Sequence, residues 1–143
     1  MIKIDLKKEF RLVNKLCFGG KLKPIKVKFA GQIWGNSKNT YIGRKRKRRD
    51  QQVAAFYSRR TRSITLSTVY KNSIVDLRDT LAHEMLHYKD VGSVRKYNYR
   101  YHDNSFRHEC KQFRIKIAKQ HFAEELAEFK ETNRKWKKQK TRF

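Results

Sequence analysis

The sequence predicts a small α+β domain with an N-terminal helix, a short mixed or antiparallel sheet, and amphipathic helices after the sheet. Its 143 residues suit a single domain with one core. Apolar positions first recur with helical spacing, then alternate as in strands, and then return to helical spacing. Because the order helix, strands, helix, helix differs from the alternating order of parallel α/β folds, we expect an α+β arrangement.

The charge balance predicts a polyanionic partner. The chain has 37 Lys and Arg against 13 Asp and Glu, a net charge of +24. Such a surface attracts phosphate backbones, so DNA or RNA is the expected partner. An anionic membrane surface is the weaker alternative, and we expect no membrane association.

Cysteine use and the N-terminal residues predict an intracellular protein. Cys17 and Cys110 form no C-x-x-C pair, so no disulfide framework is expected. The opening MIKIDLKKEF lacks the apolar centre of a signal peptide, and no apolar run reaches transmembrane length. We therefore expect a cytoplasmic protein, or one associated with a nucleoid or nucleus, that is not secreted.

A helix and a strand are predicted to open the domain. Residues 5–18 have one apolar face, and Gly19 and Gly20 end the helix. That face consists of Leu6, Phe10, Val13, Leu16 and Cys17. Residues 25–30, IKVKFA, alternate apolar and basic side chains, which predicts a half-buried strand.

A loop and a hairpin are predicted next. Residues 31–50 are rich in Gly, Asn and Ser and then reach RKRKRR at 44–49, which indicates a loop with a basic tip. VAAFYS at 53–58 and SITLS at 63–67 are strand candidates. RRTR at 59–62 joins them, so we expect a hairpin.

Ser73 is predicted to cap a helix over residues 74–90, with Gly92 as its stop. The polar, Tyr-rich residues 93–102 predict a loop, and Asp103 opens a further amphipathic helix.

From Phe122 the apolar spacing repeats, which predicts a final helix that frays into a basic tail. We therefore divide the chain into a domain over residues 1–121 and a C-terminal helix and basic tail over residues 122–143.

The stretch DTLAHEMLHYKD, residues 79–90, places His83 and His87 four positions apart with Glu84 directly after the first. In an α-helix these two histidines lie roughly 40° apart on one face. The opposite face is apolar: Ile74, Leu81 and Met85. The helix is therefore expected to bury that side and to present both imidazoles elsewhere.

This H-E-x-x-H spacing fits a zinc hydrolase helix. Two imidazoles four residues apart can reach one zinc ion, and the adjacent Glu84 can take a proton from zinc-activated water. The competing interpretation is a solvated helix face on which Glu84 balances nearby cations. A catalytic site needs a third ligand, and the residues alone leave four candidates: His102, His108, Glu109 and His121.

Three stretches in order, NKLCFGGKLKPIKVKF, TLAHEMLHYKD and HDNSF, resemble the SprT-like zinc metallopeptidase family, to which the Spartan proteases belong. The resemblance spans residues 9 to about 113 and implies a zincin-like fold. It implies zinc held by His83, His87 and His102, with Phe106 packed behind the third ligand and Glu84 as general base. Asp103 stands where the family often has Gly, and the four-cysteine zinc ribbon of some members has no counterpart among these residues.

The resemblance implies a zinc-dependent endopeptidase that acts on nucleic-acid-bound proteins, with the predicted hairpin beside its site. We expect nucleic-acid contacts from the basic run and a monomeric protein. The run consists of Arg44, Lys45, Arg46, Lys47, Arg48 and Arg49. Two alternatives remain: a basic nucleic-acid-binding protein with a structural or vestigial metal site, and a metal-dependent nuclease. The nuclease is disfavoured because no compact carboxylate cluster for magnesium occurs.

Overall fold

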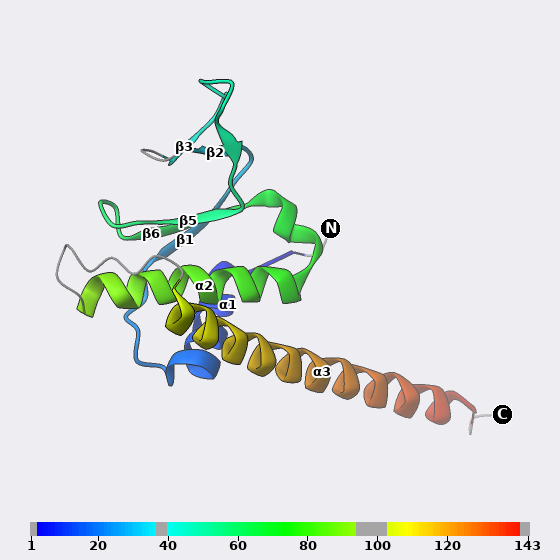
Figure 1. Cartoon of the computed structure of the whole chain (residues 1–143). Helices are drawn as coiled ribbons and strands as arrows, with labels where there is room; N and C mark the ends of the chain where they lie inside the picture. The colour runs from blue at the N-terminus through cyan, green and yellow to red at the C-terminus, as the bar shows by residue number, and fades with distance from the viewer. Residues whose placement is uncertain (1–2, 37–39, 94–102, 141–143) are drawn as a thin grey trace.

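The computed structural model describes residues 3–36, 40–93 and 103–140. It confirms the α+β class, with three helices and two small sheets (Figure 1). The elements in chain order are α1 (Leu6–Phe18), β1 (Lys26–Ala30), β2 (Ile33–Gly35), β3 (Thr40–Ile42), β4 (Gln51–Gln52), β5 (Ala55–Ser58), β6 (Ser63–Ser67), the 3-10 helix η1 (Thr68–Asn72), α2 (Ile74–Ser93) and α3 (Asn104–Lys140).

The main sheet has the strand order β1-β6-β5, so β5 lies at its edge. β1 runs parallel to β6 with Val27 opposite Ile64, and β5 runs antiparallel to β6 with Tyr57 opposite Ile64. Arg62 adopts a positive φ of 49° in the turn between β5 and β6. The predicted first strand and the predicted hairpin are confirmed.

The loop prediction for residues 31–50 was wrong in part, because β2 and β3 of a second sheet lie within this segment, whereas the basic tip at 44–49 has no helix or strand, as predicted. The strand order of the second sheet is β3-β2-β4, all antiparallel. The strands are only two or three residues long, too short to show an alternating pattern. Buried Asp50 fixes this sheet by accepting hydrogen bonds from the Tyr41 hydroxyl and from Asn36 Nδ2, the latter at 2.9 Å.

The predicted starts of α1, α2 and α3 and the predicted stop of α1 are confirmed. Asp5 caps α1 by accepting from the backbone N–H of Lys7 at 3.1 Å, and Gly19 closes it with a φ of 61°. Ser73 Oγ accepts from the backbone N–H of Asp76 at 3.3 Å at the start of α2. The predicted stop at Gly92 lies one residue before Ser93, the last described residue of α2.

Helix α2 lies at the centre of the core, between the main sheet and α3 (Figure 1). Leu77, Leu81 and Met85 are fully buried on it, and Phe106, Phe113 and Ile117 pack onto the core from α3.

Helix α3 is continuous from Asn104 to Lys140, where the sequence had suggested two helices. The helix therefore crosses the division that we placed at residue 121, and that division stays a prediction. Within the described ranges, no helix is long and apolar enough to span a bilayer.

A buried ion cluster ties the three helices together. Arg78 of α2 is 5% exposed, and its Nε donates to Glu9 Oε2 of α1 at 2.6 Å. Its Nη1 donates to Glu124 Oε2 of α3 at 2.9 Å. A buried guanidinium requires such partners, so the cluster fixes how the helices dock.

We expect Glu9→Gln to lower the free energy of unfolding by about 3 kcal/mol, because it removes one of the two carboxylates that compensate the buried Arg78. Urea unfolding measures this as a shifted midpoint at constant slope. The matched control is Glu131→Gln, which breaks a solvent-accessible pair with Arg134 and should cost less than about 1 kcal/mol. Equal costs for the two variants would contradict a structural role for the cluster.

Candidate metal centre

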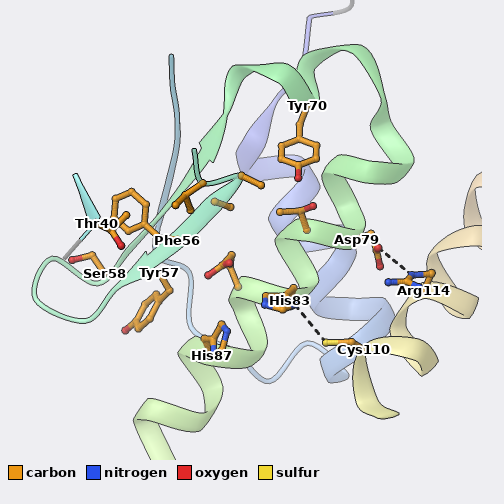
Figure 2. A pocket seen from close by; sticks show the side chains of 15 residues that line it. Thr40, Phe56, Tyr57, Ser58, Tyr70, Asp79, His83, His87, Cys110 and Arg114 are labelled. Atoms are coloured by element: carbon orange, nitrogen blue, oxygen red, sulfur yellow. Dashed lines mark hydrogen bonds and ion pairs between the residues drawn. The ribbon is translucent and has the colours of Figure 1, made fainter. Parts of the chain in front are cut away.

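A cavity of about 640 Å³ lies between α2, the β5–β6 hairpin and the start of α3. Figure 2 shows His83 and His87 on successive turns of α2, on the side that faces the hairpin. The lining residues are Thr40, Val53, Ala54, Ala55, Phe56, Tyr57, Ser58, Tyr70, Asp79, Thr80, His83, Glu84, His87, Cys110 and Arg114. The predicted position of the hairpin beside the histidines is therefore confirmed.

The two histidines occupy the cavity side of α2 because the opposite side of the helix is held in the core. Leu81 and Met85 are each 0% exposed, which fixes the rotation of the helix. The imidazole centroids of His83 and His87 lie 5.0 Å apart with their planes at 74°. Both rings are thus close enough to serve one ion.

Phe106 of α3 packs against both imidazoles. Its ring stacks on His87 with centroids 4.6 Å apart, and it meets the edge of His83 at 5.0 Å. Phe106 is 1% exposed, and its backbone N–H donates to Asp103 Oδ1 at 2.8 Å, which caps α3. The start of α3 therefore restricts the orientations of the two histidines.

The carboxyl of Glu84 is buried beside the cavity, and this burial changes its pKa. Burial raises the pKa of the Glu84 carboxyl to about 7, while a hydrogen bond from the backbone N–H of Tyr57 opposes that rise. Because Tyr57 belongs to the edge strand β5, the carboxylate connects α2 to the hairpin. Such a group can hold or release a proton near neutral pH.

Two further contacts from α3 border the cavity (Figure 2). Cys110 Sγ lies 3.8 Å from His83 Nδ1, within reach of a weak hydrogen bond. Arg114 Nε donates to Asp79 Oδ2 at 3.1 Å. Both contacts join α3 to the histidine face of α2.

The donor set fits two of the three protein ligands of a catalytic zinc site, since zinc prefers imidazole nitrogen and both rings face one cavity. Over the described residues, no three His, Cys, Asp or Glu side chains are grouped closely enough to hold an ion. His102, the third ligand that the resemblance implies, lies outside the described residues. It therefore stays a prediction.

The other candidates for the third ligand lie on α3 and do not appear among the residues that line the cavity. His108 is exposed and Glu109 is half-buried. His121 Nε2 lies 2.9 Å from Glu125 Oε1. None of these three side chains therefore lies against the cavity that the two imidazoles border.

Three contributions at the site were missed by sequence reasoning: the backbone N–H of Tyr57, the thiol of Cys110, and the contact of Phe106 with both imidazoles. Only Phe106 had a signal, because the H-x-x-x-F stretch places it near the site. The other two depend on how β5 and α3 dock on α2, which no local pattern encodes.

The basic run at 44–49 lies between β3 and β4, and all six side chains are exposed. The Lys45 ammonium lies 5.4 Å from the centroid of the Trp34 ring, and the Arg46 guanidinium lies 4.4 Å from that of Tyr41. The backbone N–H of Arg46 also donates to the Tyr41 hydroxyl at 2.8 Å. The run is thus anchored to the second sheet, and its role toward nucleic acid stays a prediction.

A comparison with known protein families identifies the family of this chain. A model of the SprT-like family matches residues 6–127, most of the chain, and the protein belongs to this family. The SprT-like family is associated with metalloprotease activity, so membership points to a function of the metallopeptidase type. Neither curated proteins nor solved structures give a significant match.

We expect the metal-free protein to lose about 3 kcal/mol of stability through Glu84 as pH rises from about 4.5 to about 7. In this window the unfolded chain has released the proton that the folded protein retains, so rising pH favours unfolding. Urea unfolding in chelator between pH 4 and 8 measures the effect. The wild-type curve should fall relative to that of Glu84→Gln, and parallel curves would contradict the assignment.

Proposed function

We propose that this protein is a zinc-dependent metalloendopeptidase with a zincin-like arrangement. The observation that carries the proposal is the pair of imidazoles beside a buried carboxyl in one cavity, on the central helix of a SprT-like chain. His83 and His87 would hold zinc together with His102. Bound zinc supplies Lewis-acid activation of water and of the scissile carbonyl.

Glu84 is the proposed proton carrier. Its ionised carboxylate accepts a proton from the attacking water and then delivers that proton to the leaving amine. Burial raises the pKa of this carboxyl to about 7 in the metal-free protein, and the positive charge of bound zinc would favour its ionised form, while the Tyr57 N–H orients the carboxylate. Phe106 helps to orient the imidazoles by packing against them. Cys110 helps to orient the His83 ring through its contact with His83 Nδ1.

The edge strand β5 is the proposed docking site for an extended peptide. It lines the cavity over its whole length, from Ala55 to Ser58, and pairs with β6 on one side. Backbone groups of an edge strand can pair with a substrate strand. A peptide bound there would pass the face of α2 that carries the histidines.

Nucleic acid is the proposed scaffold that brings protein substrates to the enzyme. The net charge of +24 and the exposed run at 44–49 support phosphate contacts. The run is anchored to the second sheet, and Thr40 of that sheet lines the cavity. Proteins held on DNA or RNA would then be presented to the site.

We expect Glu84→Gln to abolish proteolysis of a DNA-bound protein while the variant keeps its zinc, because the amide cannot accept the proton. Cleavage of a radiolabelled histone on DNA gives the activity, and elemental analysis gives the zinc content. His83→Ala should lose both, and Lys111→Ala, exposed on α3, should change neither. Retention of activity in Glu84→Gln would remove Glu84 from the mechanism, and DNA cleavage without proteolysis would indicate a nuclease.

We expect the triple variant Lys47→Ala, Arg48→Ala, Arg49→Ala to reduce the slope of log affinity against log salt by about 2 to 3 for duplex DNA, since each lost phosphate contact removes about 0.9. Fluorescence anisotropy at several salt concentrations measures the slope. The matched control removes three exposed charges from α1, through Lys7→Ala, Lys8→Ala and Arg11→Ala. Equal changes in the two variants would show that the run has no special role.

A further inference from the structure

Helix α3 continues well beyond the body of the domain (Figure 1). Ile117 is its last fully buried residue, and Glu124 makes the ion pair with Arg78. Over residues 125–139 every side chain except that of Glu131 is exposed. A solvated helix of this length is marginally stable in water, so contacts beyond the body would be needed to hold it.

The exposed part of α3 carries an apolar stripe. Its members are between 41% and 67% exposed: Ile115, Phe122, Leu126, Phe129 and Trp136. The face that packs on the core holds Phe106, Cys110, Phe113 and Ile117. At 100° per residue the two faces are centred roughly 150° apart around the helix axis. The stripe therefore points away from the domain that bears it.

The stripe has coiled-coil spacing. Its five apolar members, at positions 115, 122, 126, 129 and 136, follow one another at intervals of seven, four, three and seven residues, which fits about three heptads with Lys119 and Asn133 at the intervening positions. In this register Lys119, Leu126 and Asn133 occupy the a positions of the heptads. The d positions hold Ile115, Phe122, Phe129 and Trp136. A polar residue at an a position, and Asn above all, selects a paired register at some cost in stability. A face that only touched water would not require this spacing.

We propose that α3 forms a parallel two-stranded coiled coil with a second copy of this chain. In that arrangement Glu125 at a g position lies opposite Lys130 of the partner subunit at an e position, and the pair occurs twice. In an antiparallel pair, the e positions of one helix would instead lie against the e positions of the other. Three e positions hold lysine, Lys116, Lys130 and Lys137, so this arrangement brings like charges together. The two Glu125–Lys130 pairs therefore favour the parallel direction, and they offset the repulsion between the two copies of Lys119, which face each other at an a position.

The arrangement leaves room for both domains. Because each body lies on the side of α3 away from the stripe, two parallel helices carry their domains outward and apart. The net charge of +24 per chain opposes pairing, so the dimer tightens as salt screens that repulsion. This proposal departs from the monomer that the sequence had suggested.

Sedimentation velocity of the full chain, from 1 to 200 µM and at low and high salt, tests the proposal. We expect a monomer–dimer equilibrium that tightens at high salt. Leu126→Glu should raise the dimer dissociation constant by about 100-fold or more, because it buries a charge in the seam. Ala127→Glu, one residue further along and outside the seam, should change it by less than about threefold. A monomer under all conditions, or equal effects of the two substitutions, would overturn the proposal.

Direction is tested by crosslinking. Asn133→Cys places a thiol at an a position, opposite its counterpart in a parallel dimer, and should form an intermolecular disulfide under mild oxidation. Arg134→Cys points outward and should not. If wild type stays monomeric while Leu126→Glu weakens binding to duplex DNA or to anionic vesicles, the stripe serves that other partner and the proposal fails.

Discussion

The structure depends on the burial of α2. This helix contacts the main sheet, α1 and α3, and its apolar residues Leu77, Leu81 and Met85 are fully buried. Each such side chain contributes about 1.5–3 kcal/mol when removed from water. Their burial fixes the rotation of the helix, and that rotation places both histidines on the side of the cavity. The geometry of the site is therefore a consequence of core packing.

Two buried ionisable groups on α2 show how the same low-dielectric interior serves structure and chemistry. The guanidinium of Arg78 is matched by carboxylates from α1 and α3, which satisfies its charge and joins the helices. Glu84, six residues further along, accepts a hydrogen bond from the backbone N–H of Tyr57, and burial raises the pKa of its carboxyl. The buried charge of Arg78 is balanced by two carboxylates, so it serves as a structural link. Among the described residues no such counter-charge contributes to the pKa of the buried Glu84 carboxyl, so this group can hold or release a proton near neutral pH.

Much of this arrangement could be predicted from sequence because it is local. Helical spacing, the Ser73 cap and the hairpin signal depend on near neighbours, and so does the shared face of His83 and His87. The second sheet was missed because its strands are too short for a pattern and are fixed by Asp50 through distant hydrogen bonds. The buried Arg78 cluster was also missed, since Glu9 lies 69 positions away in sequence. Long-range docking of charged residues leaves no periodic signal.

The central claim is that α2 presents two imidazoles to one zinc ion, completed by a third histidine. Zinc K-edge absorption of protein loaded with one equivalent of zinc tests it most directly. We predict a shell of nitrogen and oxygen at about 2.0–2.1 Å, with scattering from three imidazoles that falls in His83→Ala and His102→Ala. A sulfur shell at about 2.3 Å would place the Cys110 thiolate among the ligands and contradict the account, as would failure to bind zinc.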